Sequence, residues 1–158
     1  MIQRVQSIYL VIVMVVLSII TFSTDFFSYL NATSKFSFSS YGLTEYAISD
    51  GTLVSHTPYP LYISTIGLTL LTFICLMSYK NLNRQRTLGR YLFYIYFLFV
   101  VGMIIWSMLG SSMIDAQTET REMGTGFFLF ICGFPFTFMA NIGIKRDKNL
   151  LASLDRLR

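Results

Sequence analysis

Four apolar stretches without a charged side chain alternate with polar segments along the chain. They cover residues 5–24, 61–79, 91–114 and 123–144. A helix rises about 1.5 Å per residue, so stretches of this length match the ~30 Å hydrocarbon core of a bilayer. The pattern predicts four membrane-spanning helices. The first is predicted to be an uncleaved span, because its apolar run is long and lacks an A-x-A-like cleavage site.

The only long connection, residues 25–60, has the pattern of a small antiparallel sheet. Polar and apolar residues alternate from Lys35 to Ser39, which is the period of a half-buried strand. Asp50 and Gly51 separate two β-rich runs, 46–49 and 52–55, and such a pair favours a type I′ hairpin turn. We expect this β-rich loop to cap the ends of the helices. The alternative at this point is an irregular loop.

Basic residues gather in the segments that we expect on the cytoplasmic side. Ten of the twelve Lys and Arg residues lie in the head 1–4, the loop 80–90 and the tail 145–158, whereas six of the eight acids lie in the other connections. Short loops rich in Lys and Arg stay on the cytoplasmic side. We therefore predict that both termini are cytoplasmic and that residues 25–60 lie outside. The candidates for contact with lipid headgroups or a partner are Lys80, Arg84, Arg86, Arg90, Lys145, Arg146 and Lys148.

The tail is predicted to form an amphipathic helix on the cytoplasmic side. Its apolar residues have helical spacing and are Leu150, Leu151, Leu154 and Leu157. Three acids cluster in the last outer connection, at Asp115, Glu119 and Glu122, and we interpret them as a solvated rim. In the fourth span, Pro135 predicts a kink, and Asn141 is placed to bond a neighbouring helix or to reach the membrane interface.

Composition supports the membrane class and excludes several functions. The chain is 54% hydrophobic and 13% charged, against about 25% charged residues in soluble domains. The net charge of +4 indicates orientation and contact with anionic lipid, not nucleic-acid binding. The single histidine, His56, has no ligand set around it in sequence, so we expect no metal site, cofactor or catalytic residue. The predicted spans contain no ionisable group of the kind that proton-coupled carriers use.

The two ends of the chain resemble a known family. The similar segments are Met1-Ile2-Gln3-Arg4-Val5-Gln6 and the closing stretch from Ala140-Asn141 through Lys145-Arg146-Asp147 to Leu154-Asp155-Arg156-Leu157-Arg158. They are similar to an uncharacterised, domain-of-unknown-function family of small four-span inner-membrane proteins of Bacteroidota. The resemblance implies a bacterial inner membrane and a periplasmic first loop, and it implies no activity, cofactor or site residue. In topology alone the layout is similar to claudins, with Tyr41-Gly42-Leu43 near their signature position, but the claudin cysteine pair is missing.

These observations predict an all-α membrane protein, a single four-helix bundle over residues 1–158 with a small β-rich outer loop. Two functions compete. The first is a non-catalytic subunit or scaffold of a larger inner-membrane complex, for export or envelope assembly, with the bilayer and other membrane proteins as partners. The second is a carrier or binder of a lipid or small apolar ligand, held in an aromatic cleft around Pro135.

Overall fold

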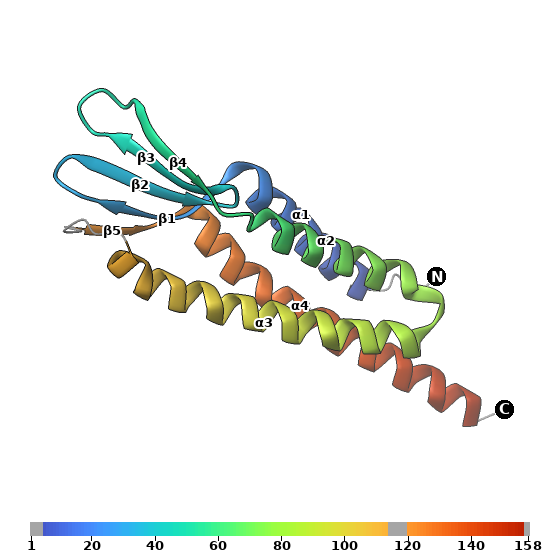
Figure 1. Cartoon of the computed structure of the whole chain (residues 1–158). Coiled ribbons are helices and arrows are strands. Elements are labelled where there is room, and N and C mark those ends of the chain that lie inside the picture. Colours follow the sequence, from blue (N-terminus) through green and yellow to red (C-terminus); the bar gives the residue numbers. More distant parts are fainter. Residues whose placement is uncertain (1–4, 114–119, 157–158) are drawn as a thin grey trace.

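Helices and a sheet are arranged end to end in the computed structural model of the chain (Figure 1). The structure describes residues 5–113 and 120–156. The elements are α1 (Val5–Ser23), β1 (Asp25–Leu30), β2 (Ser34–Ser39), β3 (Gly42–Ala47), β4 (Leu53–Pro58), α2 (Tyr62–Met77), η1 (Ser78–Lys80), α3 (Leu82–Met113), β5 (Thr120–Met123) and α4 (Thr125–Arg156). We call the two ends of the helical bundle the sheet end and the basic end. α1 begins and α4 ends at the basic end (Figure 1).

The helices pack in a ring in which α1 contacts α2 and α4, and α3 contacts α4 and α2. On α1 the core positions recur three or four residues apart, at Leu10, Val13, Leu17 and Ile20. The opposite face is also apolar and exposed, as Ile8, Val11 and Val15 show. A soluble protein rarely leaves so much apolar surface uncovered. Four helices, α1 to α4, are long and apolar enough to cross a membrane.

The strands form one five-stranded antiparallel sheet in the order β4-β3-β2-β1-β5. β2 confirms the strand predicted around residues 35–39. β1 and β5 were not predicted as strands. β5 follows α3 in the chain and pairs with β1. The all-α fold class was therefore wrong: the fold is mixed α and β. The claudin-like topology stated with that fold class is not supported, and the sheet takes its fifth strand, β5, from the connection between α3 and α4.

The β3–β4 hairpin confirms a turn near Asp50-Gly51 but corrects its type. Ala47 N–H donates to Thr52 O at 3.0 Å and Gly51 N–H donates to Ala47 O at 2.9 Å, so the loop is longer than two residues. Gly51 has a φ of +63°, and no described residue other than glycine has a positive φ. A type I′ turn needs two such residues, so this turn is not type I′.

The segment 80–90, predicted as a loop, is helical from Leu82 onward. Asn81 caps the helix: its Oδ1 accepts a hydrogen bond from Arg84 N–H at 3.2 Å, and its carbonyl accepts one from Gln85 N–H at 2.9 Å. The predicted fourth span and tail likewise form one helix, α4, which continues past the other helices at the basic end (Figure 1). Asp115, Glu119, Leu157, residues 1–4 and the side chains of Leu151 and Leu154 lie outside the described part.

Aromatic rings join the sheet to the bundle. Phe38 on β2 stacks on Phe27 of β1, with ring centroids 4.7 Å apart, and on Trp106 of α3 at 5.6 Å. A register shift between Asp25 and Phe27 turns both Phe26 and Phe27 into the core, and Phe26 meets Phe130 of α4 edge-on at 6.2 Å. We call Phe26, Phe27, Phe38, Tyr59 and Trp106 the aromatic joint.

Two hydrogen bonds to one backbone carbonyl of α3 hold β5 and β1 against this helix. The carbonyl of Ser107 accepts hydrogen bonds from Arg121 Nη1 at 2.8 Å and from Tyr29 Oη at 3.2 Å. Burial raises the pKa of the Tyr29 hydroxyl, and the charge of Arg121 partly opposes that rise. These two hydrogen bonds therefore connect β5 and β1 to the same carbonyl of α3.

A buried amide pair lies at the basic end between α1 and α3. Gln6 Nε2 donates to Gln85 Oε1 at 3.4 Å, and the two side chains are 1% and 0% exposed. Among the described residues, Gln6 Oε1 and Gln85 Nε2 have no hydrogen-bond partner. The pair is therefore half satisfied, which is costly in a low-dielectric setting.

We predict that Gln85→Leu alone lowers the free energy of unfolding by about 1–3 kcal/mol, because it leaves the Gln6 amide buried without a partner. The double variant Gln6→Leu/Gln85→Leu should recover most of this loss, since both polar groups are then gone. Thermal unfolding in detergent measures both. If the losses measured for Gln6→Leu alone and for Gln85→Leu alone simply added in the double variant, the two amides would not be coupled.

Candidate functional site

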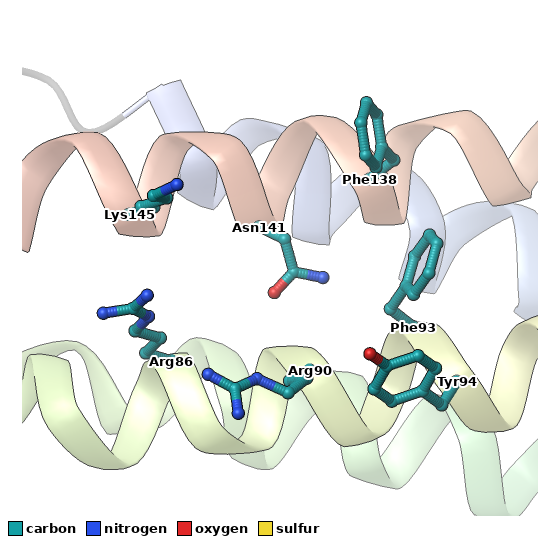
Figure 2. A pocket seen from close by; sticks show the side chains of 7 residues that line it. All are labelled: Arg86, Arg90, Phe93, Tyr94, Phe138, Asn141 and Lys145. Atoms are coloured by element: carbon teal, nitrogen blue, oxygen red, sulfur yellow. The ribbon is translucent and has the colours of Figure 1, made fainter.

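A groove between α3 and α4 at the basic end is the best-defined candidate site (Figure 2). Its volume is about 210 Å³. It is lined by Arg86, Arg90, Phe93, Tyr94, Phe138, Asn141 and Lys145. We call it the α3–α4 groove.

Helical spacing places these side chains on facing sides of the two helices. On α3, Arg86, Arg90 and Tyr94 recur every four residues and so share one face. On α4, Phe138, Asn141 and Lys145 follow at intervals of three and four. Figure 2 shows Lys145 above Arg86, with Arg90 and Asn141 next along the groove. The groove thus has a basic mouth near the end of the bundle and an aromatic inner part.

Asn141 fixes how closely the two helices approach. Its Nδ2 donates to Gly89 O on α3 at 2.9 Å and to Thr137 O on its own helix at 3.2 Å. A Cβ at Gly89 would lie 2.6 Å from Asn141 Oδ1, so only glycine leaves room for this contact. The predicted bond from Asn141 to a neighbouring helix is confirmed. Because two carbonyls hold Nδ2, the amide orientation is set and Oδ1 remains as an acceptor.

The groove is strongly positive. Arg86, Arg90 and Lys145 line it, and no carboxylate does. Among the residues whose side chains the structure describes, none forms a salt bridge with these three. Three neighbouring cations without counter-charges repel one another and attract an anion. The aromatic rings beside them offer apolar surface, so the site suits an anion that also has an apolar part.

Three of the other four predicted contact residues line two further hollows at the basic end. Lys80 and Arg84 line one beside η1, of about 340 Å³. Arg146 lines another, also about 340 Å³, together with Lys145, and all its lining residues belong to α4. Lys148 lies half-buried on α4 and lines none of these three hollows. The structure therefore brings together three of the seven predicted cations in a site between two helices.

Sequence reasoning missed the groove itself. It treated residues 80–90 as a loop and 145–158 as a separate tail, so it did not set Arg90 against Asn141 and Lys145. The signal that would have revealed the groove is the four-residue spacing of Arg86, Arg90 and Tyr94, which is meaningful only if the segment is helical. Phe93 and Phe138 also line the groove, and both belong to the predicted spans.

Aromatic side chains fill the region around Pro135, where the sequence predicted an aromatic cleft. Tyr96 stacks on Phe130 with centroids 4.9 Å apart, and its hydroxyl donates to Phe130 O at 2.9 Å. Phe134 packs on Phe93 at 5.0 Å. A small cavity near Phe130 has a volume of only about 20 Å³, close to the space of one water molecule. The wider space between α3 and α4 lies at the basic end.

No metal-ligating cluster is found among the described residues, where no three His, Cys, Asp or Glu side chains converge. His56 is exposed on β4, opposite Thr44 of β3. Cys75 and Cys132 are both free thiols.

A family model described as "Domain of unknown function (DUF4293)" matches residues 2–157, which is nearly the whole chain. No curated protein and no solved structure matches the chain.

Proposed function

Because the chain belongs to the DUF4293 family, whose description states no function, we propose from its geometry that it is a non-catalytic subunit or scaffold of a larger membrane complex. Its four helices cross the bacterial inner membrane, with the basic end in the cytoplasm and the sheet in the periplasm. The sheet presents the β3–β4 hairpin to another envelope protein. A role in export or envelope assembly, in a Bacteroidota-type cell, would place that partner in the same membrane or the periplasm.

The observation that carries this proposal is the exposed hairpin. Every residue of β4 is exposed, and β4 forms one edge of the sheet. Leu53 and Val54 are each 58% exposed and Ile48 at the loop is 51% exposed. The hairpin extends away from the bundle (Figure 1). Sheet edges with apolar side chains are places where another chain adds contacts.

The charge distribution supports the orientation. Lys80, Arg84, Arg86 and Arg90 lie at the basic end, at η1 and the start of α3. Asp25, Glu45, Asp50 and Glu122 lie at the sheet end, whereas Asp147 lies on α4 at the basic end. Basic residues beside membrane-crossing helices remain in the cytoplasm. Tyr59 and Tyr62 at the sheet end and Tyr79 near the basic end occupy the levels typical of interfacial aromatic residues.

The test is co-purification from native membranes in mild detergent, with mass spectrometry of the proteins that accompany the chain. We expect the wild-type chain to carry a defined companion, and Leu53→Glu/Val54→Glu to lose it, since charges on both residues disrupt an apolar contact. The matched control is Ser49→Glu/Thr52→Glu, which adds the same charge to the exposed loop of the same hairpin. A wild-type chain that runs alone, as monomer or homo-oligomer, would overturn the proposal.

A further inference from the structure

We propose that the α3–α4 groove is a binding site for the headgroup of one anionic phospholipid in the inner leaflet, with its phosphate between Arg86, Arg90 and Lys145. This inference goes beyond the proposed function and rests only on its placement of the helices in the membrane. It does not depend on whether the chain has a protein partner.

The phosphate preference follows from the charges. Three cations line a groove of about 210 Å³ that no carboxylate lines. Two of them are arginines, whose planar forks match phosphate oxygens with two parallel hydrogen bonds. A zwitterionic headgroup would bring a positive amine among three positive side chains. The groove therefore favours a lipid with net negative charge over phosphatidylcholine or phosphatidylethanolamine.

The lipid character follows from the rest of the lining. Phe93, Tyr94 and Phe138 continue the groove toward the apolar part of the bundle. Tyr94 and Phe138 are 60% and 52% exposed, so their rings are available to acyl chains. Figure 2 shows the Tyr94 hydroxyl on the side of the ring toward Arg90, where it can donate to a phosphate oxygen. A free phosphate ion would use the cations but not these rings.

Asn141 adds a preference among anionic lipids. Its Nδ2 is held by Gly89 O and Thr137 O, so its Oδ1 is the atom available to a ligand. An amide oxygen accepts a hydrogen bond from a hydroxyl but repels a phosphate oxygen. The site therefore fits a headgroup that carries both a phosphate and a hydroxyl, as phosphatidylglycerol does.

The groove differs from the other hollows at the basic end. The hollow with Arg146 is lined by residues of α4 alone, so it is the surface of one helix. The hollow with Lys80 and Arg84 has two cations, at the connection between α2 and α3. Only the α3–α4 groove, of these three, combines three cations with a hydrogen-bonding floor between two helices.

The test is native mass spectrometry of the full-length protein in detergent, titrated with phosphatidylglycerol or phosphatidylcholine of the same acyl chains. We expect one phosphatidylglycerol molecule to bind much more tightly than phosphatidylcholine. A cation near an anionic lipid surface contributes about fivefold in affinity, so Arg86→Gln/Arg90→Gln should weaken this binding about 25-fold. The matched control, Lys80→Gln/Arg84→Gln, removes the same charge elsewhere at the basic end and should weaken it less than about threefold.

Three outcomes would overturn the site. Equal weakening by the two double variants would mean a diffuse basic rim. Equal binding of phosphatidylcholine would mean no headgroup selection, and displacement of the lipid by millimolar inorganic phosphate would make a free anion the ligand.

Asn141→Leu tests the hydroxyl contact and should reduce the preference for phosphatidylglycerol over phosphatidic acid. Unchanged helical circular dichroism together with unchanged emission of Trp106 verifies that each variant keeps its fold. Because the protein is purified alone, a negative result here is separate from a missing protein partner.

Discussion

Phe38→Ala is expected to destabilise the protein by about 3–5 kcal/mol, the range for removing a large aromatic ring from a packed core. Phe38 is 2% exposed and is the centre of the aromatic joint. Its ring contacts Phe27, Trp106 and Tyr59, at centroid distances of 4.7, 5.6 and 6.4 Å. The loss of this ring leaves a cavity between the sheet and α3, so these two parts should separate at lower temperature.

Trp106 gives a direct measurement because it is the only tryptophan in the sequence. In Phe38→Ala we expect its emission to shift to longer wavelength and the midpoint of thermal unfolding in detergent to fall. Phe128→Ala is the control: Phe128 is 57% exposed on α4, and its loss should change stability by less than about 1 kcal/mol. Equal losses for the two variants would show that the joint does not hold the sheet to the bundle.

Gly124→Val should be similarly damaging, for a different reason. Gly124 lies between β5 and α4, and its N–H donates to Phe26 O at 2.9 Å. A Cβ at this position would collide with the carbonyl oxygen of Asp25 and would lie 3.1 Å from the carbonyl carbon of Phe26. Both are backbone atoms that cannot rotate away, so the junction between β1 and α4 must open. We expect a loss of about 3 kcal/mol or more.

Gly67→Ala is the matched control for this variant. Gly67 lies inside α2, and a Cβ there would have no neighbouring atom within 4 Å. Alanine is the better helix former by about 1 kcal/mol, so this variant should melt at the same or a higher temperature. Thermal unfolding in detergent compares the two directly. A Gly124→Val protein with the wild-type midpoint would contradict the close packing of β1 on the start of α4.

The pattern of polar and apolar residues was enough to predict the elements that are determined by neighbouring residues in the chain. The apolar runs predicted the four helices, and the alternation around Phe36 and Phe38 predicted β2. β1 was missed because four consecutive residues, Phe26 to Tyr29, are all buried. A strand of this kind has no alternation of polar and apolar residues in its sequence. The shift in register next to Phe26 and the packing of α4 against this strand cause that pattern. β5 is a short polar strand whose pairing with β1 depends on contacts far away in sequence.

The helix ends at the basic end were misplaced for a related reason. Charges were used to mark where a membrane span stops, but a helix need not stop at the membrane surface. Asn81 starts α3 ahead of Arg84, Arg86 and Arg90, so these side chains are fixed on a rigid helix. The cationic residues were identified from the sequence, but their convergence with Lys145 and Asn141 required the packing of α3 on α4.

The most direct test of the central claim is the membrane topology of two positions at opposite ends of the bundle. In a background with Cys75→Ala and Cys132→Ala, single cysteines are placed at His56 on β4 and at Asn83 in the first turn of α3. Right-side-out spheroplasts are then treated with a membrane-impermeant maleimide. The account predicts immediate labelling of His56→Cys and labelling of Asn83→Cys only after permeabilisation. Labelling of Asn83→Cys in intact spheroplasts, or protection of His56→Cys, would contradict it.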